Sequence, residues 1–135
     1  MTPQGAVIRA SVYTWGEPRG EAIACKLVEL AQLGADVAVV HNGISEGVRG
    51  ILDQGGVTWF DSRLDRDHDG VKDFYVHHKC LLIGQPQAET WRTYTGSHNW
   101  RTGSLRRGDE VLLRIEGKDT FDAYIANFDL LRRTR

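Results

Sequence analysis

The sequence predicts an α/β domain in which a mixed β-sheet is flanked by α-helices. Strand and helix patterns alternate in the first half of the chain, strands follow one another in the second half, and a helix pattern comes last. The 135 residues have the size of one ordinary domain, and 41% apolar with 26% charged residues is typical of a globular protein. We therefore expect a single domain over residues 1–135.

The first half of the chain contains two strands and a helix between them. Residues 6–15 are rich in β-branched and aromatic side chains, which favours a strand, and glycine and proline between 16 and 20 break it. A helix is predicted over 20–33, closed by Gly34 just past its end. The short continuous apolar run 37–40 indicates a strand that is buried on both faces.

The next elements follow from capping residues and apolar runs. Ser45 is a candidate N-cap for a shorter helix that ends at the glycine pair 55–56. Strands are predicted at 57–60 and, after an aspartate-rich loop, at about 74–83, 90–96 and 110–116. The last predicted helix, 119–133, has apolar residues at i, i+3, i+4 and i+7.

The totals limit the function classes. The formal net charge of -1 gives no large positive field, which removes the simplest argument for nucleic-acid binding. No apolar run approaches the ~20 residues that a membrane-spanning helix needs. The first residues lack the basic and apolar regions of a signal peptide, so we expect a cytoplasmic protein or a secreted protein that has been trimmed.

The residues that suggest chemistry begin with His77 and Lys79. In a strand they project from the same face, whereas His78 points to the other. A polar pair inside an apolar strand costs free energy unless it is used or satisfied. Taken alone, the stretch is also explained by a strand end whose histidine and lysine reach solvent.

A second group of polar residues follows downstream. Gly96 allows close backbone approach, Ser97 and Asn99 offer a hydroxyl and an amide, and Glu110 opens the next predicted strand. With His77 and Lys79 they supply a nucleophile, a carboxylate to set its tautomer, and donors for phosphoryl oxygens. This inventory suits attack on phosphorus.

At these residues the chain resembles the phospholipase D superfamily, whose signature is HxK, a few apolar residues, an aspartate, then GSxN and a downstream acidic residue. His77 to Lys79, Gly96 to Asn99 and Glu110 match it. The resemblance implies one lobe of the family's two-lobed fold and a phosphodiesterase that works through a phosphohistidine.

The resemblance also implies a role for each matching residue. His77 would attack phosphorus, Lys79 and Asn99 would hold the non-bridging oxygens, and Ser97 would support the loop and the phosphate. Glu110 would accept a hydrogen bond from His77. None of these roles needs a metal or another cofactor.

One position departs from the family pattern, because Gly84 stands where the motif aspartate is expected. In the family this aspartate is thought mainly to support the strand end. The glycine therefore questions local stability more than chemistry, and it leaves open a degenerate, inactive lobe.

The mechanism needs two motif histidines, and the sequence contains one HxK–GSxN set. The second set must come from another lobe, either in a symmetric homodimer or from a missing half of a longer protein. Tryptophans 59, 91 and 100 are candidates for that interface or for the core.

Two further signals lie beside the motif. Asp65, Asp67 and Asp69 match the start of a calcium-binding loop, but the closing glutamate is missing, so a solvated acidic loop is the preferred interpretation. Arg101 follows the GSxN segment, and it either attracts an anionic substrate or belongs to a solvated helix face.

Three functions remain open. The chain is expected to be a phosphodiesterase of the phospholipase D type that acts on phospholipid. The first alternative is a metal-independent homodimeric endonuclease, an activity known for family members with a single motif copy. The second alternative is a non-catalytic lobe.

Overall fold

The structure is a computed structural model that describes residues 3–13, 15–62, 68, 79–96, 100 and 112–133. Its elements in chain order are β1 (Val7–Val12), α1 (Glu17–Gln32), β2 (Asp36–His41), α2 (Glu46–Gln54), β3 (Thr58–Asp61), β4 (Lys79–Gln85), a 3₁₀ turn η1 (Pro86–Ala88), β5 (Thr90–Gly96), β6 (Leu112–Glu116) and α4 (Lys118–Arg133).

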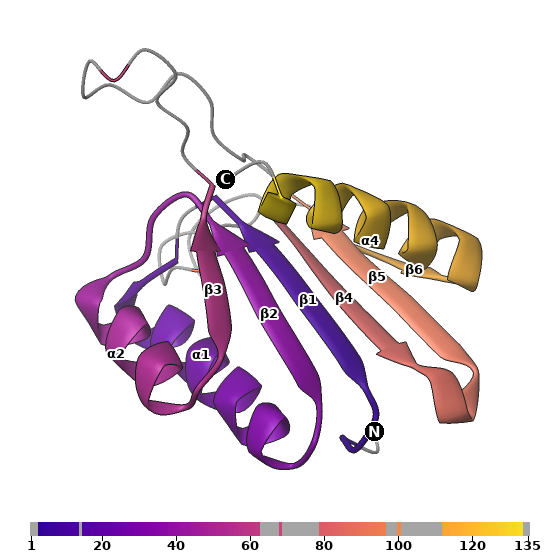
Figure 1. The fold of residues 1–135 in the computed structure, drawn as a ribbon, viewed down its shortest axis with the longest axis horizontal. Coiled ribbons are helices and arrows are strands. Elements are labelled where there is room, and N and C mark those ends of the chain that lie inside the picture. The colour runs from indigo at the N-terminus through magenta and orange to yellow at the C-terminus, as the bar shows by residue number, and fades with distance from the viewer. Residues whose placement is uncertain are drawn as a thin grey trace.

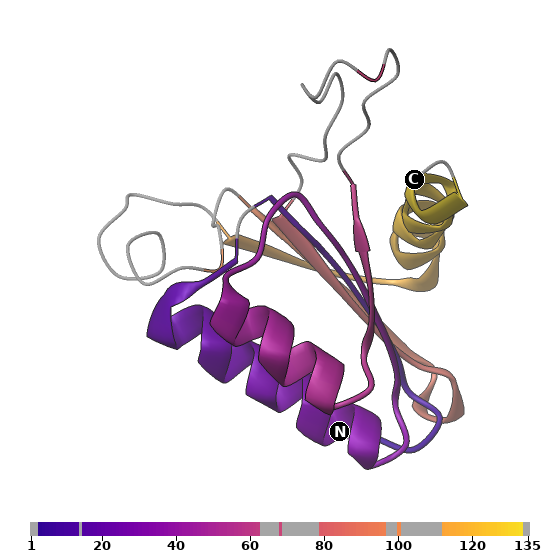
Figure 2. The same ribbon diagram turned by 60° about the vertical axis from the view of Figure 1, so that its left-hand side comes forward.

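The described strands form one sheet in the order β3-β2-β1-β4-β5-β6 (Figure 1). Strands β1, β2 and β3 are parallel to one another, whereas β4, β5 and β6 pair antiparallel and β4 joins them to β1. Helices α1 and α2 cover one face and α4 covers the other (Figure 2). The predicted α/β architecture with a mixed sheet is confirmed.

Strand β2 shows why an unbroken apolar run marks a central strand. Val37 and Val39 belong to the core beneath α1 and α2, and Ala38 and Val40 pack with Phe128 of α4 on the opposite face. Both faces of the strand are therefore buried, as predicted.

The predicted helix ends are largely confirmed. The Val48 N–H donates to the Ser45 hydroxyl at 3.2 Å, so Ser45 caps α2. Gly34 and Gly56 follow α1 and α2 with φ of 107° and 69°, in the left-handed region that glycine favours. The start of α1 was predicted too late, because Pro18 lies in its first turn, where the missing N–H costs no hydrogen bond.

The observed bounds of some strands differ by a few residues from the predicted ones. The first strand is shorter than predicted and β4 continues to Gln85, where Pro86 begins the 3₁₀ turn. Strand β5 has the predicted bounds, and α4 begins one residue early. Residues 74–78 and 110–111 of the predicted strands lie outside the described residues. No helix in the described ranges is long and apolar enough to cross a membrane.

Candidate active site

The described part of the predicted site is Lys79, the first residue of β4. The other candidates lie outside the described residues; they are His77, Ser97, Asn99, Arg101 and Glu110 in the site, and Asp65, Asp67 and Asp69 in the acidic loop. The arrangement of the site is therefore built from the described residues that border the motif.

Strands β4, β5 and β6 border the motif segments with termini that lie at the same end of the sheet. Lys79 begins β4 and pairs with Val12 at the end of β1, while Gly96 ends β5 and pairs with Leu112 at the start of β6. The Cys80–Thr95 pair keeps β4 and β5 in register at this end. In the sequence, Lys79 comes two residues after His77, Gly96 directly precedes Ser97, and Leu112 comes two residues after Glu110.

Lys79 lies on the face of the sheet that carries α1. Tyr13 is the residue that follows β1, and the Lys79 ammonium nitrogen is 5.2 Å from the centre of its ring. A cation over an aromatic face is attracted by the ring's negative charge distribution. The sequence analysis did not identify Tyr13. Its contact with Lys79 depends on the pairing of β1 with β4, which are distant in the sequence.

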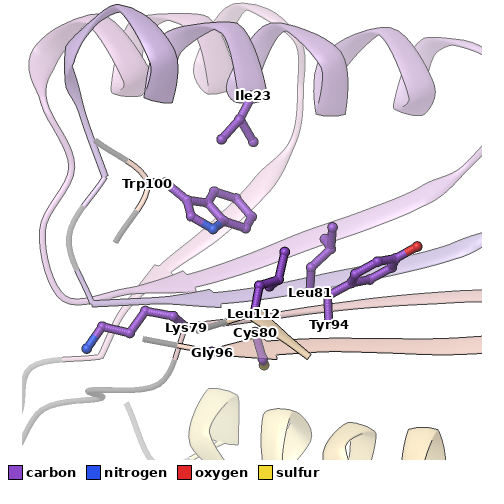
Figure 3. A pocket seen from close by; sticks show the side chains of 8 residues that line it. All are labelled: Ile23, Lys79, Cys80, Leu81, Tyr94, Gly96, Trp100 and Leu112. Carbon is purple, nitrogen blue, oxygen red and sulfur yellow. The ribbon is translucent and has the colours of Figure 1, made fainter. Parts of the chain in front are cut away.

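An open cavity of about 240 Å³ adjoins Lys79. Figure 3 shows it between α1 and the last strands of the sheet. Its lining is Ile23, Lys79, Cys80, Leu81, Tyr94, Gly96, Trp100 and Leu112. Lys79 is the sole cationic residue in this lining, and its ammonium group extends away from the apolar side chains (Figure 3).

Cys80 contributes to the cavity wall, but its sulfur points toward α4, away from Trp100 and Ile23 (Figure 3). Burial raises the pKa of this thiol above its ordinary value, an effect that hydrogen bonding with Ser11 only partly opposes. The protonated thiol is a poor nucleophile. Both cysteines are free; Cys80 is buried and Cys25 is exposed.

Trp100, which directly follows the GSxN segment, is held at the start of α1. Its carbonyl oxygen accepts a hydrogen bond from the Gly16 N–H at 3.0 Å. Its ring meets the Trp15 ring edge to face, with centroids 4.8 Å apart, and the Trp15 indole N–H donates to the Gly20 carbonyl at 2.7 Å. Trp100 is thereby tied to the protein core.

Gly20 makes this close approach possible. A Cβ at this position would collide with the Trp100 carbonyl oxygen and would lie 2.8 Å from the Trp15 ring. Sequence reasoning interpreted Gly20 as part of a chain break, although it lies within α1. A glycine inside a helix pattern was the available signal for such packing.

We expect Gly20→Ala to destabilise the protein by about 1–3 kcal/mol, because the added methyl group must displace a backbone carbonyl. Catalytic activity should fall as well, since the displaced carbonyl belongs to the residue after the GSxN segment. Urea denaturation and a turnover assay measure the two effects.

Gly50→Ala in α2 is the matched control. Outside the adjacent residues and the helix backbone, no atom lies within 4 Å of a Cβ at this position, so alanine should stabilise the helix by about 0.5–1 kcal/mol through its higher helix propensity. An equal gain in stability from both substitutions would show that Gly20 does not permit the Trp100 contact.

Gly84 occupies the motif aspartate position for a packing reason. A Cβ there would lie 2.7 Å from the Phe121 ring of α4, and Phe121 is 7% exposed. The glycine therefore lets α4 sit directly on β4. The departure from the motif aspartate at this position therefore has a structural reason, the close packing of Phe121.

Restoring the aspartate by Gly84→Asp should destabilise the protein by about 3 kcal/mol or more, because a carboxylate would be forced against a buried ring. In a Phe121→Ala background the same substitution should cost less, since the two residues are in contact. Additive costs in urea denaturation would contradict this account of the glycine.

Comparison with protein families gives a match over most of the chain. The family described as "Cardiolipin synthase, PLD-like domain" matches residues 6–132. No curated protein matches the chain in sequence.

The fold is similar to two solved structures of comparable chain length. NucT from Helicobacter pylori superposes with a TM-score of 0.74 at 16% identity, covering 94% of this chain and 79% of that one. Nuc from Salmonella typhimurium, described as a phospholipase D family member, gives a TM-score of 0.71 at 17% identity, covering 98% and 82%.

A larger protein contains a similar unit. Polyphosphate kinase from Porphyromonas gingivalis has a TM-score of 0.66 at 10% identity, and the match covers 96% of this chain but 18% of the kinase. The family match spans nearly the whole described fold, from β1 into α4. The chain therefore belongs to the phospholipase D superfamily, as a PLD-like domain.

Proposed function

We propose that the chain is a phosphodiester hydrolase or transferase of the phospholipase D type, and that phospholipid is its substrate. The observation that carries the proposal is the meeting of Lys79, Gly96 and Leu112 at one edge of the sheet. These residues border the segments that contain His77, Ser97, Asn99 and Glu110.

The proposed reaction has two displacements. A ring nitrogen of His77 attacks phosphorus, the bond from phosphorus to the leaving alcohol breaks, and a histidine of a second lobe gives that alcohol a proton. Water or another alcohol, deprotonated by the second histidine, then attacks phosphorus and releases His77. Glu110 accepts the hydrogen bond that sets the tautomer of His77.

Lys79 and Asn99 oppose the negative charge that grows on the non-bridging oxygens in the transition state. Tyr13, which lies under the Lys79 ammonium, limits the positions that this flexible side chain takes. Ser97 supports the segment between Gly96 and Trp100, and Arg101 attracts the anionic substrate. No step of this reaction uses a metal ion.

Phospholipid is favoured over nucleic acid by the described surface around Lys79. The adjoining cavity is lined mainly by apolar side chains, and the matching family is described by an enzyme of phospholipid synthesis. The near-neutral net charge provides little electrostatic attraction for a polyanion such as nucleic acid.

A metal-independent homodimeric nuclease is the second candidate. It is favoured by the similarity to NucT and Nuc, whose chains are only slightly longer than this one, because single-copy members of the family include such nucleases. In that case the second lobe is another copy of this chain.

The test is an assay of the purified protein on phosphatidylcholine vesicles and on plasmid DNA, each in EDTA and each repeated with His77→Ala. Hydrolysis of the lipid alone, lost in the variant and changed less than a few-fold by EDTA, supports the proposal. Cleavage of DNA alone supports the nuclease. Activity that disappears in EDTA and returns with calcium contradicts the metal-free mechanism and assigns a role to the aspartate loop.

A further inference from the structure

We propose that the cavity beside Lys79 is a binding site for the alkyl chain of an amphiphile whose phosphate lies at Lys79. This inference rests on the proposed function and deepens it, because it assigns the apolar part of the substrate to described residues. Its ligand class is a phosphate with one attached hydrocarbon chain.

The chemistry of the lining separates a charged end from an apolar body. Lys79 supplies positive charge at one end, while Ile23, Leu81 and Leu112 present aliphatic side chains (Figure 3). A ligand that satisfies both parts has an anionic head joined to a hydrocarbon tail. Burying each methylene of that tail is favourable by about 0.8 kcal/mol.

The size of the cavity suits part of a chain. Pockets for drug-sized ligands measure about 300–1,000 Å³, and this cavity is smaller, at about 240 Å³. Its lining includes Leu112, which is 61% exposed, so apolar surface reaches from the cavity to the outside of the protein at this residue. The remainder of the tail would stay in the lipid aggregate.

The same face of the sheet gives a nucleic-acid strand little positive charge. By strand alternation, Arg92 of β5 and Arg114 of β6 lie on the face of Lys79, but both form ion pairs with Glu116, each at 3.6 Å. The two arginines share one carboxylate, so with Lys79 the described face offers few cations for the successive phosphates of a polynucleotide, whereas its apolar lining favours a ligand with a hydrocarbon part.

Binding of decyl phosphate below its micelle concentration tests the inference. This phosphate monoester needs no turnover to bind, so His77→Ala can be used beside the wild type. Titration calorimetry over the series hexyl, octyl and decyl phosphate should show a Kd that falls roughly four-fold for each added methylene. Inorganic phosphate should bind far more weakly than decyl phosphate.

Two neighbouring leucines provide a matched pair of variants. Leu112 and Leu113 are 61% and 54% exposed, but they project from opposite faces of β6, and of the two only Leu112 lines the cavity. Leu112→Asp should weaken decyl phosphate binding by about tenfold or more, because it removes apolar contact and repels the phosphate. Leu113→Asp should change the Kd less than about three-fold.

Several results would overturn the inference. One is a Kd that does not depend on chain length, and another is equal weakening in both variants. If Leu112→Asp instead abolishes self-association of a chain that binds no decyl phosphate, the cavity belongs to a second copy. Leu112-dependent binding of a short oligothymidylate without decyl phosphate binding would assign the cavity to a stacked base.

The two proposals fail in different ways. Normal hydrolysis of a short, soluble diester by a protein that does not bind decyl phosphate contradicts the alkyl-chain site alone. Chain-length-dependent binding by a protein whose turnover survives His77→Ala contradicts the proposed catalytic role of His77 alone.

Discussion

Replacement of His77 by alanine is expected to reduce turnover by more than about 10⁴-fold, the range observed when other hydrolases lose a covalent nucleophile. His78→Ala should retain most activity, because adjacent strand residues project from opposite faces. Lys79, the next residue, lies on the α1 face beside the cavity. By the alternation of strand residues, His77 is predicted to share this face.

The comparison of the two variants needs equal folding. Circular dichroism and urea denaturation should show wild-type stability for both, so that a difference in turnover reports chemistry. Equal loss of turnover in the two alanine variants would show that the register assigned to the motif is wrong.

An isolated monomer of this chain is expected to be nearly inert. One chain supplies one nucleophile and no matching general acid, and general acid catalysis typically contributes ~10²–10⁴-fold. If the chain assembles with itself, light scattering should show a dimer, and activity per chain should fall on dilution below the dimer Kd. If the second lobe belongs to another chain, activity should appear when that lobe is added.

Mixed chains test this sharing of the site. Addition of excess His77→Ala chains to the wild type should form heterodimers with one functional motif histidine, and the rate should fall strongly. A monomer that turns over normally at nanomolar concentration would contradict the shared site, because the sequence contains one HxK–GSxN set.

Local sequence signals predicted much of the fold because they reflect local physics. The hydroxyl of Ser45 caps α2, and glycines follow both α1 and α2 in left-handed conformation. The continuous apolar run of β2 correctly indicated a strand covered on both faces. The start of α1 was misplaced because proline is compatible with a first helical turn.

The supports of the site were less predictable because they join distant segments. The Trp15–Trp100 contact and the Gly16–Trp100 hydrogen bond depend on packing between the start of α1 and the residue after the GSxN segment. Likewise, Gly84 is understood only when Phe121 of α4 is placed against it. A motif identifies candidate catalytic residues from their local spacing, whereas these contacts depend on how distant segments pack in the folded protein.

During turnover His77 should become covalently bound to phosphorus. The most direct measurement is mass spectrometry of the assembled protein, quenched at alkaline pH within one turnover after mixing with a short-chain phosphatidylcholine. We expect an added phosphatidyl group on the peptide that contains His77, located at that residue by fragmentation and absent in His77→Ala. Turnover without an adduct, or an adduct on another residue, would contradict it.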